Sequence, residues 1–131
     1  MLLCLLSGCQ AIPDKTGAER AISQLHVAYN AKEYDKAMSF YGSQFFEKTP
    51  KEKWRKQLEA IRGKLGEWKS ADLTGMKWRT FVGTDGSGTY WDLTYDSKFA
   101  NSPAKENFTV FCPSNSSDCQ ILGHGISSDR F

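Results

Sequence analysis

The sequence has little of what marks several common classes of protein. Its 131 residues contain no apolar run close to the roughly 18–20 residues of a membrane-spanning helix. Neither sign of charge dominates, because 17 Lys+Arg stand against 15 Asp+Glu, whereas a nucleic-acid-binding protein needs a concentrated basic surface. There are only two histidines, and no serine elbow, catalytic cysteine context or paired-histidine metal helix. We therefore expect no nucleic-acid partner, no cofactor and no metal.

The composition is that of one folded domain. Hydrophobic residues make up 40% of the chain and aromatic residues 13%, and disordered tails are far poorer in aromatics. A mass of 14.7 kDa leaves little room for a second domain.

The sequence opens with an apolar segment that ends in a cysteine. Residues 1–9 read MLLCLLSGC, and Leu6-Ser7-Gly8-Cys9 resembles a bacterial lipobox, whose cysteine is lipidated and becomes the mature N-terminus. A signal peptide starts with a positive charge and has a longer apolar stretch, so we expect the natural precursor to begin further upstream. The competing interpretation is an apolar N-terminal strand or tail.

The lipobox implies three segments and a location. We expect a lipoprotein signal at 1–9, a tether at 10–16 and a single domain at 17–131. Two or three acyl chains on Cys9 would hold the protein firmly on a membrane, facing the periplasm or the exterior. Gln10 replaces the aspartate that retains such proteins in the inner membrane of enteric bacteria, which favours the outer membrane.

Two further cysteines, Cys112 and Cys119, bracket a segment rich in turn-forming residues. Such a loop can bring two strand ends within bridging distance, and an oxidising compartment favours a disulfide. The alternative is a metal site that adds His124. That site would lack a fourth ligand and the close cysteine pair of zinc sites.

Helical patterns come first along the chain. Apolar residues at spacings of three and four predict a helix over 17–30, and a second helical segment covers about 34–40 before Gly42. The clearest helix covers 51–65. We expect Thr49 to cap it, Pro50 to take its first turn and Glu52 to complete a capping box.

Strand patterns follow, with a period of two. They cover 68–82, with a bulge at Thr74–Gly75, then 89–96, 106–111 and 120–126, and residues 83–88 form a hairpin loop. Helices grouped before hairpin-linked strands predict an α+β fold. The N-terminal helices would pack on one face of a curved antiparallel sheet of about four strands.

The chain resembles a known group of folds. The segments that carry the resemblance are Lys32-Glu33-Tyr34-Asp35-Lys36-Ala37, Phe45-Phe46, Lys53-Trp54 and Leu58 through Gly66. They look like small cone-shaped, cystatin-like domains related to nuclear transport factor two and ketosteroid isomerase, a compact form of which occurs in bacterial lipoproteins. The resemblance covers about 17–126 and implies a cone with an open end. That fold serves enzymes, binding modules and assembly domains alike.

The candidate site residues are few. His26 and His124 lie at the edges of apolar patterns, where packed histidines are common. Asp92 with Tyr90 could imitate an acid–tyrosine pair, although alternation puts both side chains on the solvent side. Most aromatic residues take core-facing positions. If the cone holds a pocket, we expect it to be lined by His26, Tyr29, Trp54, Trp78, Trp91 and His124.

Two surfaces could meet partners. The helix over 51–65 carries six basic and two acidic residues between Lys51 and Lys64, a face that suits anionic lipid or an acidic partner. An apolar patch on the outer sheet face near Phe81, Tyr90 or Phe111 would favour a protein partner or a homodimer. The leading hypothesis is a non-catalytic, lipid-anchored binding or assembly domain. A binder of small apolar ligands comes second, and an enzyme with His26 or Asp92 as base comes third.

Overall fold

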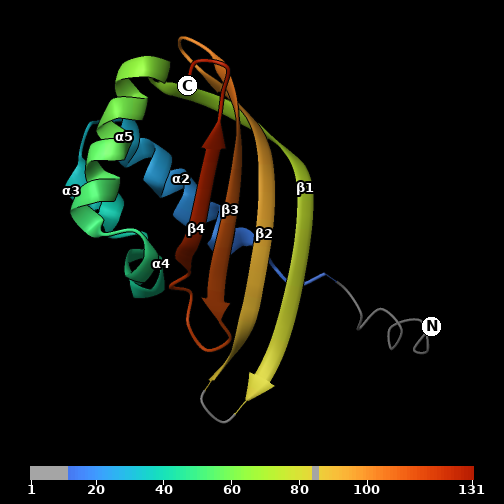
Figure 1. Ribbon diagram of the computed structural model, residues 1–131. Coiled ribbons are helices and arrows are strands. Elements are labelled where there is room, and N and C mark those ends of the chain that lie inside the picture. The colour runs from blue at the N-terminus through green and yellow to red at the C-terminus, as the bar shows by residue number, and fades with distance from the viewer. Residues whose placement is uncertain (1–11, 84–85) are drawn as a thin grey trace.

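The computed structural model describes residues 12–83 and 86–131, and these form an α+β domain, which confirms the predicted class (Figure 1). The helices come first in the chain and the strands follow. The helices are α2 (Thr16–Asn30), α3 (Tyr34–Met38), α4 (Ser43–Lys48) and α5 (Lys51–Leu65). The strands are β1 (Trp68–Gly83), β2 (Gly86–Phe99), β3 (Pro103–Pro113) and β4 (Gln120–Ser127).

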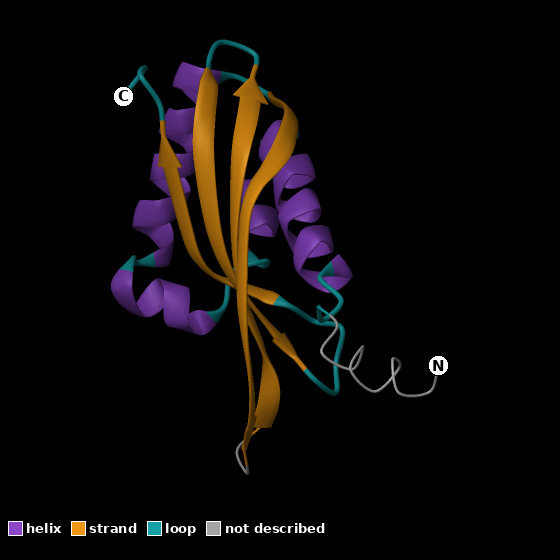
Figure 2. Ribbon diagram, turned by 90° about the vertical axis from the view of Figure 1, so that its right-hand side faces the viewer, coloured by secondary structure: helices purple, strands orange, loops and turns teal. Residues whose placement is uncertain are grey.

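The strands form one antiparallel sheet in the order β1-β2-β3-β4, so each strand pairs with its neighbour in sequence. The sheet curves, and the helices lie on one face of it (Figures 1 and 2). The opposite face carries polar pairs along much of its length, among them Thr109 with Asp92 and Asn107 with Thr94. The sheet therefore has a covered inner face and an outer face open to solvent.

The core lies between the helices and the inner face. In β2 and β3 the inward positions alternate with outward ones, as period-two patterning requires. The helices contribute the apolar stripes of α2 and α5. The fully enclosed side chains of this core include Leu25, Met38, Leu58, Leu65, Trp91, Leu93, Phe108, Val110 and Ile121.

The bulge predicted in the first strand is confirmed. The register of β1 against β2 shifts between Leu73 and Gly75, and a second shift occurs between Trp68 and Ser70. β1 and β2 are longer than the alternation indicates, because pairing continues to Gly83 opposite Gly86. The predicted loop over 83–88 is therefore mostly strand.

Two predictions about the helices are wrong in detail. The second helical segment ends at Met38, and a further short helix, α4, follows Gly42, although its sequence shows no extended apolar stripe. The capping box before α5 does not form: Pro50 is the N-cap, and no side chain caps this helix. Pro50 lies one position earlier than expected, so Thr49 falls outside the helix.

Candidate functional site

A cluster of polar side chains lies at the centre of the core. Glu106 of β3 is 1% exposed. Its Oε1 accepts hydrogen bonds from His26 Nε2 of α2 at 2.9 Å and from Ser97 Oγ of β2 at 2.8 Å. Its Oε2 accepts one from His124 Nε2 of β4 at 2.8 Å. Tyr41, which follows α3, lies with its hydroxyl 2.7 Å from His124 Nδ1. We call these five residues the buried polar network.

Alternation along the strands explains why these residues point inward. In β3, Glu106 shares the inner face with Ala104, Phe108 and Val110, all of them buried. Ser97 takes the inner position that follows Tyr95 in β2. The network therefore occupies positions that an ordinary core would fill with apolar side chains.

The hydrogen bonds define the protonation states. Burial opposes ionisation of Glu106, but the hydrogen bonds from His124 and His26 outweigh it and keep the pKa of this carboxyl below its usual range. Burial lowers the pKa of His124, and Glu106 offsets this only in part. Nε2 of His124 then carries the proton toward Glu106, so its Nδ1 accepts from Tyr41, whose own pKa is raised by burial. The three groups are a carboxylate, a neutral imidazole and a neutral phenol.

Aromatic rings enclose the network. The His26 ring stacks on Trp68, with centroids 4.1 Å apart and an interplanar angle of 7°. The His124 ring stacks on Phe108 at 4.2 Å and meets Trp54 edge-on at 5.7 Å. These rings hold both imidazoles in fixed planes and keep water from the carboxylate, which strengthens its hydrogen bonds.

A groove of about 380 Å³ opens beside the network, between α5 and the end of β4. Its walls are mainly apolar, with polar groups supplied by one glutamine, one lysine and one histidine. The residues that line it include Trp54, Gln57, Ile61, Lys64, His124 and Ile126. The ring of His124 thus connects the groove to the buried network, although both of its nitrogens already have partners inside the protein.

The structure brings some of the predicted pocket residues together. Trp54 and His124 line the groove, and His26 reaches His124 through Glu106. Tyr29 and Trp91 lie in the core, where the Tyr29 hydroxyl donates to the carbonyl of Gly66. Trp78 does not take a core position, since it is 40% exposed near the far end of β1.

The acid–tyrosine pair considered in the sequence lies away from the buried polar network. Asp92 is exposed on the outer face of the sheet and accepts a hydrogen bond from Thr109 Oγ1. Tyr90 lies on the same face, with its ring 4.8 Å from that of Phe111. Neither residue contributes to the groove or to the network.

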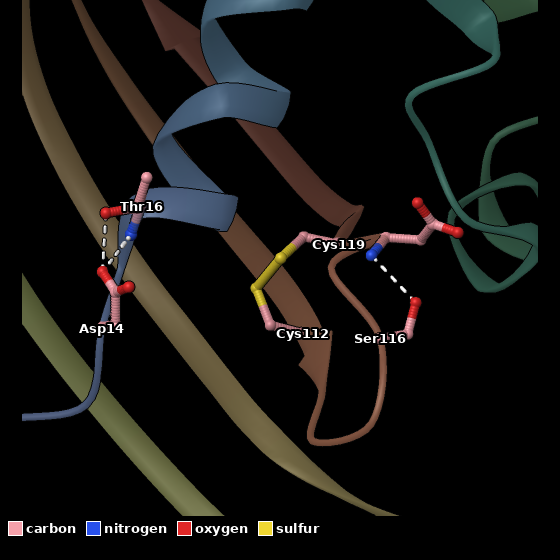
Figure 3. The surroundings of a disulfide bond; sticks show 6 residues. Asp14, Thr16, Cys112, Ser116 and Cys119 are labelled. Atoms are coloured by element: carbon pink, nitrogen blue, oxygen red, sulfur yellow. Dashed lines mark hydrogen bonds between the residues drawn. A yellow bond between two sulfur atoms is a disulfide. The ribbon is translucent and has the colours of Figure 1, made fainter.

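Cys112 and Cys119 form the expected disulfide (Figure 3). The bond closes the turn between β3 and β4, and Gly17 at the start of α2 packs closely against Cys119. Because both sulfurs are joined to each other, neither is a thiolate that could bind a metal with His124. Cys9, the predicted lipidation site, lies outside the described residues.

Sequence reasoning missed three members of the network: Glu106, Ser97 and Tyr41. A signal for Glu106 was present, because it precedes Phe108 and Val110 at a spacing of two in a strand whose other inward residues are apolar. A carboxylate at such a position requires buried donors, and the two histidines at apolar edges are suitable donors. Tyr41 follows a short helix and has no comparable pattern.

The fold and the network define a class of protein: an α+β domain whose curved sheet encloses an ionised carboxylate between two imidazoles. The chain belongs to the family DUF4019, described as a protein of unknown function, which matches residues 21–121. The match runs from α2 to the start of β4 and so includes His26, Tyr41, Ser97 and Glu106, but not His124. Searches among curated proteins and among solved structures find no match.

Proposed function

We propose that the protein is a non-catalytic binding module, and that the groove between α5 and β4 holds a small apolar ligand. The observation that carries this proposal is the combination of an apolar groove with acid–base groups that already have partners. Its volume of about 380 Å³ falls within the range of small-molecule sites. Gln57 and Lys64 would meet a polar end of the ligand.

Binding is favoured over catalysis because a general base needs a free lone pair. His124 is the one histidine that lines the groove, but its Nδ1 accepts from Tyr41 and its Nε2 donates to Glu106. To take a proton from a ligand it would have to lose one of these bonds, and an unsatisfied buried group costs about 1–3 kcal/mol. The network is better suited to fixing the floor of the groove.

The ligand site can be tested with the neutral apolar probe 1-N-phenylnaphthylamine in equilibrium dialysis. Ala60 lines the groove and is exposed, so Ala60→Trp should fill the groove without removing a core side chain. We expect this change to weaken probe binding by about tenfold or more. Lys56→Trp, on an exposed position of α5 outside the groove, is the control. Equal binding by both variants, or none by the wild type, would contradict the proposal.

We further propose that the module is a cone-shaped domain related to nuclear transport factor two, attached through lipidated Cys9 to the outside of a membrane. The lipobox-like Leu6-Ser7-Gly8-Cys9 supports the anchor, and the disulfide is compatible with an oxidising compartment. No helix among the described residues is long and apolar enough to cross a bilayer. Mass spectrometry of the membrane fraction should detect acylated Cys9. Native protein found in the cytosol with a free thiol at this position would overturn the anchor.

A further inference from the structure

The end of the sheet that lies farthest from α5 carries a two-stranded hairpin with unusual side chains. β3 ends at Pro113, which pairs with Gly88, so beyond this point only β1 and β2 continue to Gly83 and Gly86. Figure 2 shows this hairpin reaching past the helices. We call the distal hairpin this two-stranded extension together with the ends of β1 and β2 that lead into it, residues 78–83 and 86–90. A hairpin that leaves the core has no structural need for large apolar side chains.

Three aromatic rings nevertheless gather on its outer face. Phe81 stacks on Tyr90 with centroids 5.6 Å apart, and Phe111 of β3 lies 4.8 Å from Tyr90 and 6.2 Å from Phe81. Gly88 makes room for this cluster, because a Cβ at that position would meet the Phe111 ring at 2.6 Å. Phe81 is 40% exposed, so the cluster offers a flat apolar surface to the outside.

The inner face of the same hairpin is also apolar and exposed. Val82 is 86% exposed and Trp78 is 40% exposed. A partner protein bound to one face would leave the side chains of the other face in water. The interfacial region of a bilayer surrounds an inserted hairpin on both faces, and aromatic side chains are enriched there. Arg79, whose guanidinium lies 5.0 Å from the Tyr90 ring centroid, and Lys77 add positive charge near the rings.

The described chain begins near the base of the distal hairpin. Pro13, Asp14 and Thr16 line one hollow with Thr89 and Cys112, and Thr89 pairs with Thr80 at the base of the distal hairpin. Figure 3 shows Asp14 and Thr16 beside the Cys112–Cys119 disulfide. The C-terminus lies at the opposite end (Figure 1). A membrane anchor that precedes residue 12 would therefore attach to the domain beside the distal hairpin.

We propose that the distal hairpin lies in the headgroup region of the membrane and orients the domain on it. This inference rests on the proposed anchor at Cys9. The basic helix α5 is the weaker candidate for a membrane contact. Arg55 pairs with Asp35, Glu52 and Glu59, so part of the positive charge of that helix is compensated within the domain.

The test places a fluorescent reporter on the distal hairpin or on α2 of the full chain. A chain with Cys9→Ser and an N-terminal hexahistidine tag is bound to vesicles of brominated phosphatidylcholine that contain some phosphatidylglycerol and a nickel-chelating lipid. Both reporters are made with Trp78→Phe, because native Trp78 is 40% exposed on the distal hairpin and would be quenched in either variant. Val82→Trp then reports on the distal hairpin. Val27→Trp, which makes the same change at a 63% exposed position near the C-terminal end of α2, is the matched control. We expect the bromine atoms to quench the Val82→Trp reporter at least about twofold more than the control.

A second arm measures partitioning of the untethered chain into phosphatidylcholine vesicles. Phe81→Ser with Val82→Ser should lower the partition coefficient about tenfold, because two apolar side chains no longer enter the interface. Leu73→Ser is the control, since Leu73 is 38% exposed on the same strand but away from the hairpin. In vesicles that also contain phosphatidylglycerol, the double substitution should still lower partitioning at high salt, whereas contact through α5 would be lost as salt screens the anionic lipid.

Three results would overturn the inference. They are equal quenching of both reporters, partitioning unaffected by the double substitution, and a dimer in sedimentation equilibrium that the same double substitution dissociates. The last result would assign the hairpin to self-association. Because the chelating lipid replaces the acyl chains, an unmodified Cys9 in cells would remove the anchor but leave this test interpretable.

Discussion

The buried polar network and the distal hairpin belong to one sheet, but their side chains differ in exposure and in the groups that they contact. On the inner face of β3, Glu106 is 1% exposed and meets three donors, whereas on the outer face of β1, Phe81 is 40% exposed and packs against the rings of Tyr90 and Phe111. Burying an ionised carboxylate is unfavourable unless it is fully hydrogen-bonded. Exposing clustered aromatic rings is unfavourable unless something covers them.

The two regions differ in where their partners lie. The network is complete within the described residues, so its role can be met by the folded domain alone. The aromatic cluster of the distal hairpin is not covered by another layer within the described residues. Its rings are therefore available to contact something outside the domain. We therefore expect substitutions in the network to change the free energy of unfolding, and substitutions in the hairpin to change binding to a membrane.

The largest expected effect follows from removing the shared acceptor. Glu106→Ala leaves the donors of His26, Ser97 and His124 unsatisfied in a dry core, and at about 1–3 kcal/mol for each buried group we expect a loss of about 3–5 kcal/mol in the free energy of unfolding. Urea denaturation measures it. Asp92→Ala, which removes an exposed carboxylate from the outer face, should stay within about 0.5 kcal/mol of the wild type. Similar losses in the two variants would contradict the contrast between inside and outside.

A smaller effect is expected from the disulfide, which lies between the two regions. Cys112→Ser with Cys119→Ser opens the turn between β3 and β4, and loop-closure entropy predicts a loss of about 2.5 kcal/mol. Hydrogen exchange should show faster opening near Cys112 than near Glu106. Uniform loss of protection throughout the sheet would show that the disulfide holds the whole core.

Periodic patterns predicted most of the fold because they reflect burial directly. The apolar stripes of α2 and α5, the alternation of Trp91, Leu93 and Tyr95, and the bulge before Gly75 all appear where expected. The same patterns failed where burial depends on tertiary neighbours. Trp78 is on the inner face as alternation requires, but no sequence pattern indicates that the helices end before they cover it.

The network was harder to predict because its members lie far apart in the chain. His26 is 80 residues from Glu106, and Tyr41 is 83 residues from His124. Each histidine alone suits an ordinary packed position at an apolar edge. Their joint role appears only when Glu106 is placed on the inner face of β3. An inward carboxylate in an alternating strand is thus the one local signal that could have located the site.

Tyr41 and Tyr90 form a matched pair, one in the core and one on the outer face of the sheet. Tyr41→Phe removes the donor to His124 Nδ1 in the core, which should cost about 1–2 kcal/mol. Tyr90→Phe makes the same chemical change on the aromatic cluster of the distal hairpin, where we expect less than about 0.5 kcal/mol. Thermal and urea unfolding of both variants measure the difference. Equal effects would mean that the Tyr41 hydroxyl adds nothing beyond its ring.

The smallest change in the free energy of unfolding is expected when pH is varied near neutrality, and the network determines the sign of that change. The pKa of His124 is lowered in the folded state from the ordinary 6.5, so the unfolded chain binds more protons in this range. The stability from His124 is therefore complete above about pH 6.5 and declines as pH falls below it. The slope is at most about 1.4 kcal/mol per pH unit for one proton. Glu106, whose pKa is also lowered, adds a second decline below about pH 4.5. Urea unfolding across this range should show both declines, and His124→Gln should remove the first. An unchanged first decline in that variant would mean that His124 is not its source.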